Sequence, residues 1–205
     1  MIALQINTWN GDRLANIEFH SILTEVYNDL MKDRENLTAL IKENDQFINK
    51  LILIRQHGAD MKSDSLMLLI SDIHGVTNFL PANSGYNKLN KFSDTKKLND
   101  SLISPIIIYY TQYYESLNNT NFEFLSGYSI NKFRDYLIDY GFPIQMNNTT
   151  LTLPNLDPFA VIMGDPKFIG ILRNFEYNRR IQGHGFKDAL DRVNQNIAIL
   201  QAHFI

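Results

Sequence analysis

The sequence contains no cysteine and only one tryptophan, Trp9, among its 205 residues. The lack of cysteine excludes disulfide bonds, thiolate metal sites and a cysteine nucleophile. It does not indicate a compartment, since many periplasmic proteins also lack cysteine. Hydrophobic residues make up 44% and charged residues 20% of the chain, which is typical of a folded protein and not of a disordered one.

Long apolar runs and an excess of positive charge are absent as well. No stretch of about 18 apolar residues occurs, so we expect no transmembrane helix within the chain as given. We also expect no signal peptide, because no basic segment is followed by an apolar run and a small-residue cleavage site. The formal net charge is −3, and we therefore expect no nucleic-acid partner.

Apolar residues recur at a spacing of about 3.5 in the first quarter of the chain. They are Phe19, Leu23, Val26, Leu30, Leu37, Leu40, Phe47, Leu51 and Ile54. This repeat predicts one long amphipathic helix from about Thr8 to His57, ended by Gly58. Asp33 and Asn44 occupy the two heptad positions that lack an apolar residue. Either they fix register or partner on the seam, or the helix bends away from its partner at these points.

A second long helix is predicted at the C-terminal end. Asp165 is a suitable N-cap and Pro166 a suitable first residue. Apolar residues then follow at helical spacing, at Phe168, Leu172, Phe175, Phe186, Leu190, Val193, Ile197, Leu200 and Phe204. The pattern weakens over 179–185, where two glycines, each costing about 1 kcal/mol relative to alanine, predict a kink or a local break. Two long helices at opposite ends of a chain most simply pack antiparallel.

The segments between these two helices are shorter. We expect helices after a cap at Ser63 or Asp64, after Pro81, across 93–117 with a kink at Pro105, and from Ser129 to Gly141. Residues 142–165 are expected to form a loop, with a short strand or hairpin as the alternative. The predicted fold is therefore all-α. It is an elongated helical bundle with long antiparallel N- and C-terminal helices and shorter helices between them.

The chain opens with a short apolar patch, "IALQI", which ends in Trp9 and turns polar at Asn10. Tryptophan prefers the membrane–water interface, where its ring is buried and its N–H stays hydrated. The patch therefore fits the exit of a bilayer helix, with Leu4, Ile6 and Trp9 at the membrane interface. The alternative is that Trp9 caps a soluble helical bundle.

The same opening resembles a family of bacterial single-pass membrane proteins of unknown function. Its members carry a basic N-terminus, a helix of the form "IGEIxLVxxGIxIALQxNNWNE" and then a long charged helix. This chain matches at Ile2, Ala3, Leu4, Gln5, Asn7, Trp9 and Asn10, and departs at Thr8 and Gly11. A second similarity, to a "kkLrdxIxxYY" helix and the residues before it, involves Tyr86, Leu89, Leu98, Asp100, Ile103, Tyr109 and Tyr110. A third is the stretch "DPKFIGILRNF".

The resemblance implies a membrane helix upstream of the given sequence. Residues 1–10 would then be the exit of that helix, and residues 11–205 a single helical domain. The basic segment of the family pattern precedes the membrane helix and stays cytoplasmic by the positive-inside rule. The resemblance thus implies a bacterial inner-membrane protein whose soluble domain lies in the periplasm. It supplies no catalytic or binding residues.

Motifs of catalysis are missing from the sequence. The five histidines form no His-x-x-x-His pair and no zinc pattern, and neither a Gly-rich phosphate loop nor a G-x-S-x-G turn occurs. We therefore expect no metal, no cofactor and no catalytic residues. Three arginines, Arg173, Arg179 and Arg180, lie near Glu176. A solvated helix face with i,i+4 ion pairs is the favoured interpretation of this cluster, and an anion site is the alternative.

The tyrosine-rich stretch suggests one binding site. Tyr86, Tyr109 and Tyr113 are candidates to line a pocket between helices, although packing of an aromatic helix is the favoured interpretation. Two function classes follow. The first is a non-enzymatic, membrane-anchored extracytoplasmic domain that binds, scaffolds or senses, with a protein partner or a second copy of itself. The second is an enzyme whose site is assembled only in the tertiary structure. Polar residues converging on a pocket would favour the enzyme.

Overall fold

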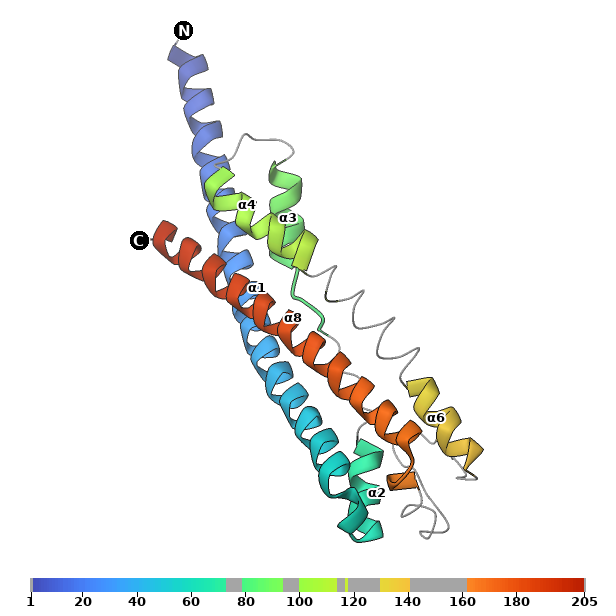
Figure 1. Ribbon diagram of the computed structural model, residues 1–205. Helices are drawn as coiled ribbons and strands as arrows, with labels where there is room; N and C mark the ends of the chain where they lie inside the picture. The colour runs from blue at the N-terminus through green and yellow to red at the C-terminus, as the bar shows by residue number, and fades with distance from the viewer. Residues whose placement is uncertain are drawn as a thin grey trace. The chain divides into compact units, whose positions relative to one another are not determined.

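The computed structural model describes residues 2–72, 79–93, 100–113, 117, 130–140 and 162–204 (Figure 1). At residues 2–10, 63, 64, 67, 71, 72, 100 and 130 it describes the backbone alone. The elements are α1 (Ile2–His57), the 3₁₀ turn η1 (Gly58–Asp60), α2 (Ser63–Asp72), α3 (Ser84–Ser93), α4 (Asp100–Ile108), the π-helical segment η2 (Tyr109–Tyr113), α6 (Ile130–Asp139) and α8 (Pro166–Phe204). All of these are helical, which confirms the predicted all-α fold.

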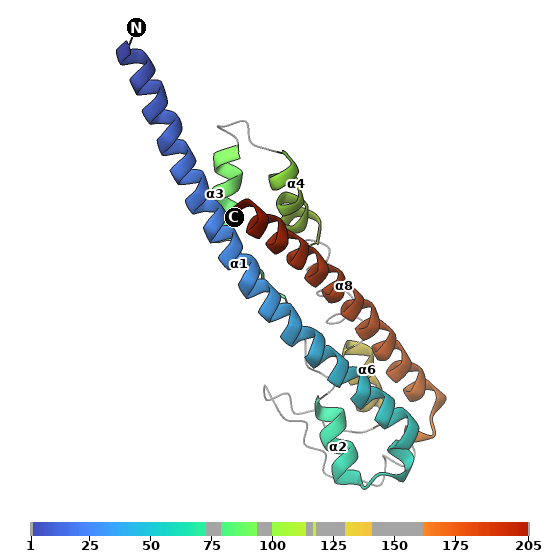
Figure 2. The same cartoon turned by 90° about the vertical axis from the view of Figure 1, so that its left-hand side faces the viewer.

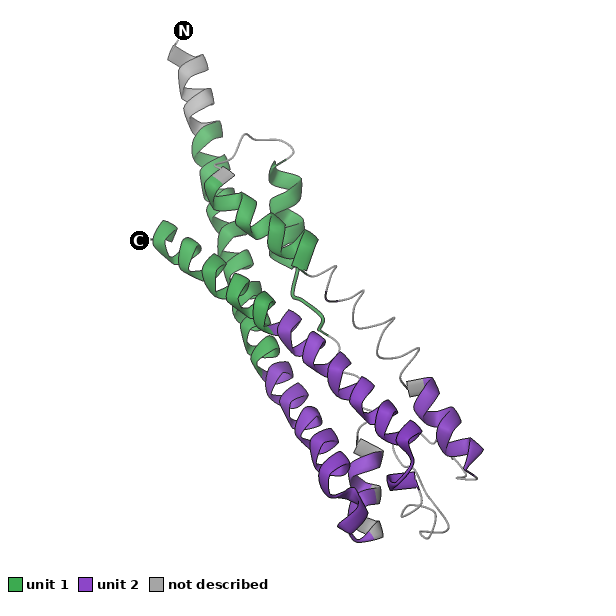
Figure 3. Cartoon of the chain, in the orientation of Figure 1, with its two compact units in different colours: residues 1–38, 79–115, 187–205 green, residues 39–78, 116–186 purple. Residues whose placement is uncertain are grey.

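The chain divides into two compact units, coloured separately in Figure 3. Unit 1 comprises 1–38, 79–115 and 187–205, and unit 2 comprises 39–78 and 116–186. The two long helices, α1 and α8, each contribute one segment to each unit. The single domain expected over residues 11–205, and the boundary at residue 10, stay predictions.

In unit 1, α1 and α8 pack antiparallel. Gln201 donates a hydrogen bond to the hydroxyl of Tyr27 at 3.1 Å, and the rings of His20 and Phe204 lie 5.1 Å apart. Residue numbers on α8 therefore rise as those on α1 fall. Apolar side chains of both helices are almost fully buried, among them Leu23, Val26, Leu30, Val193, Ile197 and Leu200.

Unit 2 shows the same antiparallel pairing and adds α2 and α6 around it (Figure 2). Asn44 donates a hydrogen bond to the backbone carbonyl of Arg179 at 2.8 Å, and Arg55 pairs with Glu176 at 3.0 Å. The apolar core draws on all four helices and the turn before α8. Its members include Leu51, Ile54, Leu66, Ile70, Phe133, Leu137, Ile162, Phe168, Leu172 and Phe175.

The predicted seam of α1 faces the core. Leu30 and Leu37 are fully buried and Leu51 nearly so, whereas Leu40 is only half-buried. Asp33 and Asn44 are both 0% exposed and hydrogen-bonded to other segments. The helix therefore keeps these two polar residues on its inner face. At Asn44 this agrees with the seam interpretation, because the carbonyl it binds belongs to α8. At Asp33 the partners are Ala82 and Tyr109, and the alternative, a bend away from α8, stays a prediction there.

Helix α8 begins as predicted but is not interrupted as predicted. The side chain of Asp165 caps it by accepting a hydrogen bond from the backbone N–H of Lys167 at 2.8 Å. The local break expected over 179–185 is wrong, since the helix continues through both glycines. Their role is close packing: a Cβ at Gly183 would lie 2.7 Å from Nδ2 of Asn44, and one at Gly185 would lie 2.9 Å from Leu117.

The middle helices form close to the predicted places. Pro105 lies inside α4, and the chain passes from α-helical to π-helical geometry at Tyr109, four residues later. Proline removes a backbone donor and disfavours a regular helix, which is consistent with this irregularity. The backbone carbonyl of Pro105 accepts a hydrogen bond from Asn196 at 3.3 Å. The predicted cap Ser129, the predicted stop Gly141 and the loop over 142–161 lie outside the described residues.

Candidate functional site

An acidic face of α1 receives the start of α3 in unit 1. Glu25, Asp29 and Asp33 lie four residues apart, so they share one side of the helix. The backbone N–H of Gly85 donates to Asp29 at 2.7 Å, and the hydroxyl of Ser84 donates to Glu25 at 2.7 Å. Asp29 thus satisfies one of the N-terminal backbone donors of α3, and Glu25 holds the side chain of its first residue. They act here as structural acceptors.

Asp33 is the most deeply buried of these acids and connects three segments. It accepts hydrogen bonds from the backbone N–H of Ala82 at 2.8 Å and from the hydroxyl of Tyr109 at 2.9 Å. Burial raises the pKa of Asp33 to about 6. The two hydrogen bonds and Lys32 oppose that shift, and the neighbouring charge of Asp29 adds to it. Burial, followed by the negative charge of Asp33, also raises the pKa of Tyr109.

The three tyrosines suggested for a pocket all lie in unit 1, each with its own partners. Tyr109 is fully buried against Asp33. Tyr86 stacks on Tyr110 with ring centroids 4.5 Å apart. The hydroxyl of Tyr113 accepts a hydrogen bond from Arg192 at 3.0 Å. These contacts agree with the packing interpretation, and a ligand pocket formed by the three side chains stays a prediction.

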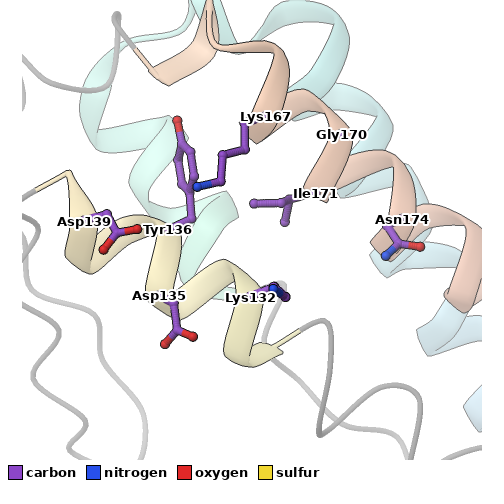
Figure 4. Close-up of a pocket in the computed structure, with 8 residues that line it drawn as sticks. All are labelled: Lys132, Asp135, Tyr136, Asp139, Lys167, Gly170, Ile171 and Asn174. Carbon is purple, nitrogen blue, oxygen red and sulfur yellow. The ribbon is translucent and has the colours of Figure 1, made fainter.

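The structure shows a pocket elsewhere, in unit 2, as a groove between α6 and α8 (Figure 4). Its volume is about 390 Å³, and it is open to solvent on one side. The lining residues are Lys132, Asp135, Tyr136, Asp139, Lys167, Gly170, Ile171 and Asn174. Those from α6 recur at i, i+3, i+4 and i+7, and so do those from α8, so each helix presents one face to the groove. The sequence does not reveal this site, because the groove depends on how α6 and α8, which are not neighbours in the chain, face each other.

A carboxylate at one end of the groove holds α6 against α8. The hydroxyls of Tyr136 and Tyr140 both donate to Oδ2 of Asp165, at 2.7 and 2.6 Å. These hydrogen bonds, that of Tyr140 first, lower the pKa of Asp165, and the same carboxylate raises the pKa of Tyr140. Lys167 lies over the ring of Tyr136 at 5.5 Å. The sequence identified Asp165 as a helix cap but not as the acceptor for two tyrosines.

A buried polar layer crosses the α1–α8 pair in unit 2. Arg179 is only 2% exposed, lies 4.5 Å over the ring of Phe47 and donates to Gln182 at 3.0 Å. Burial lowers the pKa of Arg179 to about 10, and Glu43 opposes this shift. The expected solvated face holds for Arg180, which pairs with Glu176 at 2.8 Å, but it is wrong for Arg179. The heptad sequence of α8 could have shown this, because Arg179 and Gln182 continue the spacing from Phe175 to Phe186.

The predicted membrane-interface residues, Leu4, Ile6 and Trp9, belong to α1, and their side chains lie outside the described part. Next along α1, Leu14 and Ile17 are 66% and 56% exposed. Among the helices of the described ranges, none has an apolar window long enough to cross a bilayer. Within the same ranges, no group of three or more metal-ligating side chains comes together.

Comparison of the chain with protein-family models, with curated proteins and with solved structures gave no match.

Proposed function

We propose that this chain is the extracytoplasmic helical domain of a membrane-anchored bacterial protein that binds a ligand rather than transforming it. One observation carries the proposal: α1 is a single helix from Ile2 to His57. It therefore includes the stretch that resembles the end of a membrane helix. A helix that leaves a bilayer and continues without interruption into a folded domain is a direct mechanical link between the two.

The first described turns of α1 support this assignment. Side chains from Gly11 to Glu18 are exposed, with the exception of half-buried Ala15. The described part of α8 ends at Phe204, whose ring lies against His20. The turns of α1 before Phe19 are thus largely exposed, as those of a stalk between membrane and domain would be. Exposed Leu14 and Ile17 would lie near the interface, where apolar side chains cost little.

Ligand binding is supported by the groove between α6 and α8. It is formed partly by α8, one of the two helices that contribute to both units. A ligand that binds one arrangement of α6 and α8 more tightly than another would shift the equilibrium toward the arrangement that it prefers. The size of the shift is set by the difference between the two affinities. The proposal includes sensing of this kind, in which a protein partner or a second copy of the chain responds to the ligand-dependent change.

Topology reporters on the full-length gene product test the anchor. We expect a C-terminal fusion to alkaline phosphatase to be active and a fusion to a fluorescent protein that matures only in the cytosol to be dark. The matched control is the same pair of fusions to residues 11–205, from which the proposed exit segment is removed, and it should show the reverse. A fluorescent full-length fusion, or a full-length product recovered without membranes, would show that the proposal is wrong and that Trp9 only packs or caps the helix.

An enzyme is the second candidate, and one observation favours it. The groove brings together two lysines and two aspartates, which are residue types that act in general acid–base catalysis. An enzyme would convert its ligand, whereas a binding domain would return it unchanged. Proton NMR of a bound compound, recorded before and after prolonged incubation with the chain, distinguishes the two.

A further inference from the structure

The groove between α6 and α8 carries charges of both signs at its rim. Helix α6 supplies Lys132, Asp135 and Asp139, and α8 supplies Lys167 together with the amide of Asn174. Two ammonium groups and two carboxylates give the lining no net formal charge. Figure 4 shows that these side chains come from both of the helices that border the groove.

This charge pattern restricts the ligand. A simple anion such as phosphate would meet two carboxylates, and a simple cation would meet two ammonium groups. An apolar ligand would remove all four charges from water without replacing their hydrogen bonds, which is costly. A molecule that carries one ammonium and one carboxylate can pair with both signs, which is electrostatic complementarity in its usual form.

The floor of the groove is already in place without a ligand. The ring of Tyr136 stacks on Phe168 with centroids 5.4 Å apart, and its hydroxyl is held by Asp165. Tyr136 is only 1% exposed and Lys167 already lies over its ring, so this part of the groove wall is held in place by packing. The volume of about 390 Å³ lies in the range of small-molecule sites.

Gly170 keeps the groove open. It lies in the interior of α8, where glycine costs about 1 kcal/mol relative to alanine. A Cβ built there meets no atom within 4 Å. No packing contact therefore requires a glycine, and any longer side chain would project from the groove wall into the space that a ligand would use.

We propose that this groove binds a small zwitterion, either a free amino acid or a short peptide. Lys132 and Lys167 hold the ligand carboxylate, and Asp135 and Asp139 hold its ammonium group. The amide of Asn174 donates to or accepts from the ligand backbone. The inference rests on the proposed binding function and names the ligand class of that same site.

Calorimetric titration of the purified chain tests the proposal. The probes are single L-amino acids, glycylglycine and alanylalanine, each compared with its N-acetylated and its C-amidated form. We expect saturable binding of at least one zwitterion. Blocking either end should weaken that binding about tenfold or more, as expected for the loss of a charge-assisted contact. Amino acids and dipeptides form separate arms, so the titration also shows which of the two the groove prefers.

Two variants place the binding in the groove. Gly170→Leu fills the space from an open helical position, so it should abolish binding while the melting temperature stays equal or rises. Asp139→Asn should weaken zwitterions more than their N-acetylated forms. Arg173→Gln is the matched control, because Arg173 is an exposed cation of α8 outside the groove lining and its loss should leave the affinity unchanged.

Three results would overturn the proposal: no zwitterion binds at millimolar concentration, the blocked forms bind equally well, or Gly170→Leu binds like the wild type. These measurements need no membrane, and the topology fusions need no ligand. Failure of the zwitterion assignment is therefore distinguishable from failure of the membrane anchor.

Discussion

The hydroxyl of Tyr109 donates a hydrogen bond of 2.9 Å to the carboxylate of Asp33, a residue 76 positions earlier in the chain. Both side chains are 0% exposed. Because a buried carboxylate without partners is unfavourable, Asp33 selects the arrangement in which Tyr109 and the N–H of Ala82 both reach it. One polar residue on an otherwise apolar seam thus fixes how α1 meets the segment before α3 and the π-helical segment.

This contact predicts a pH dependence of stability. The pKa of Asp33 is raised by burial to about 6 in the folded chain, from an ordinary value of 3.8. The folded state therefore binds the proton more tightly than the unfolded state. The contribution of protonated Asp33 to the free energy of unfolding is complete below pH 3.8 and is lost as the pH rises through 6. The whole contribution is about 3 kcal/mol. Asp29 and Lys32 on α1, with Tyr109 and Tyr110, are the groups that surround it.

Asp33→Asn isolates this contribution, since the amide is neutral at every pH and keeps an acceptor for Tyr109. We expect the free energy of unfolding of the wild type, relative to that of the variant, to fall between pH 4 and pH 7. Urea denaturation across that range measures it. Asp45→Asn, at an exposed position of α1, should run parallel to the wild type. Parallel curves for Asp33→Asn as well would contradict the prediction.

Asp165 predicts a pH dependence of the opposite sign. Hydrogen bonds from Tyr140 and Tyr136 lower its pKa, so its stabilising contribution is present above the ordinary carboxyl range and is lost on acidification. We expect the wild type to melt at a higher temperature than Asp165→Asn at pH 7, and the two curves to converge at low pH. A constant difference between them would show that the carboxylate charge plays no part.

The heptad seam predicts a difference between buried and exposed substitutions. Leu30→Ala, Leu37→Ala and Leu51→Ala should each lower the free energy of unfolding by about 2–5 kcal/mol, because each truncates a buried side chain. Substitutions at exposed Lys32, Glu35 and Lys42 should stay within about ±0.5 kcal/mol. Equal melting shifts in both groups would contradict the assignment.

The same leucines test whether residues 11–205 form one domain. Leu30 and Leu37 belong to unit 1 and Leu51 to unit 2. In a single cooperative domain, all three substitutions shift one common calorimetric transition. Two transitions, each moved by its own subset, would show that the single-domain prediction is wrong.

Sequence periodicity predicted the long helices well because a heptad repeat is local information. The cap of α8 at Asp165 was predicted for the same reason, since cap and helix are neighbours in the chain. The partners of Asp33 and Asn44 were beyond such reasoning, because Tyr109 and the carbonyl of Arg179 lie far from them in the sequence. The groove was also missed, because it depends on how α6 and α8 face each other and on one glycine that leaves space.

Two glycines of α8 give a final prediction with opposite outcomes for the same change. Alanine is favoured over glycine in a helix by about 1 kcal/mol. At Gly170 a Cβ meets nothing within 4 Å, so Gly170→Ala should raise the free energy of unfolding by up to that amount. At Gly183 a Cβ would lie 2.7 Å from Nδ2 of Asn44, which is buried and holds the carbonyl of Arg179. Gly183→Ala must displace that amide and should destabilise the chain by about 1–3 kcal/mol.

Asn44→Ala tests whether this clash is the cause, because it removes the side chain that a Cβ at residue 183 would contact too closely. On its own, Asn44→Ala should destabilise the chain by about 1–3 kcal/mol, since it deletes a buried hydrogen bond. Combined with Gly183→Ala it should cost less than the sum of the two single changes, because the new methyl group then occupies the vacated space. Denaturation of the four chains gives the coupling energy. Additive effects would show that Gly183 is not retained for its contact with Asn44.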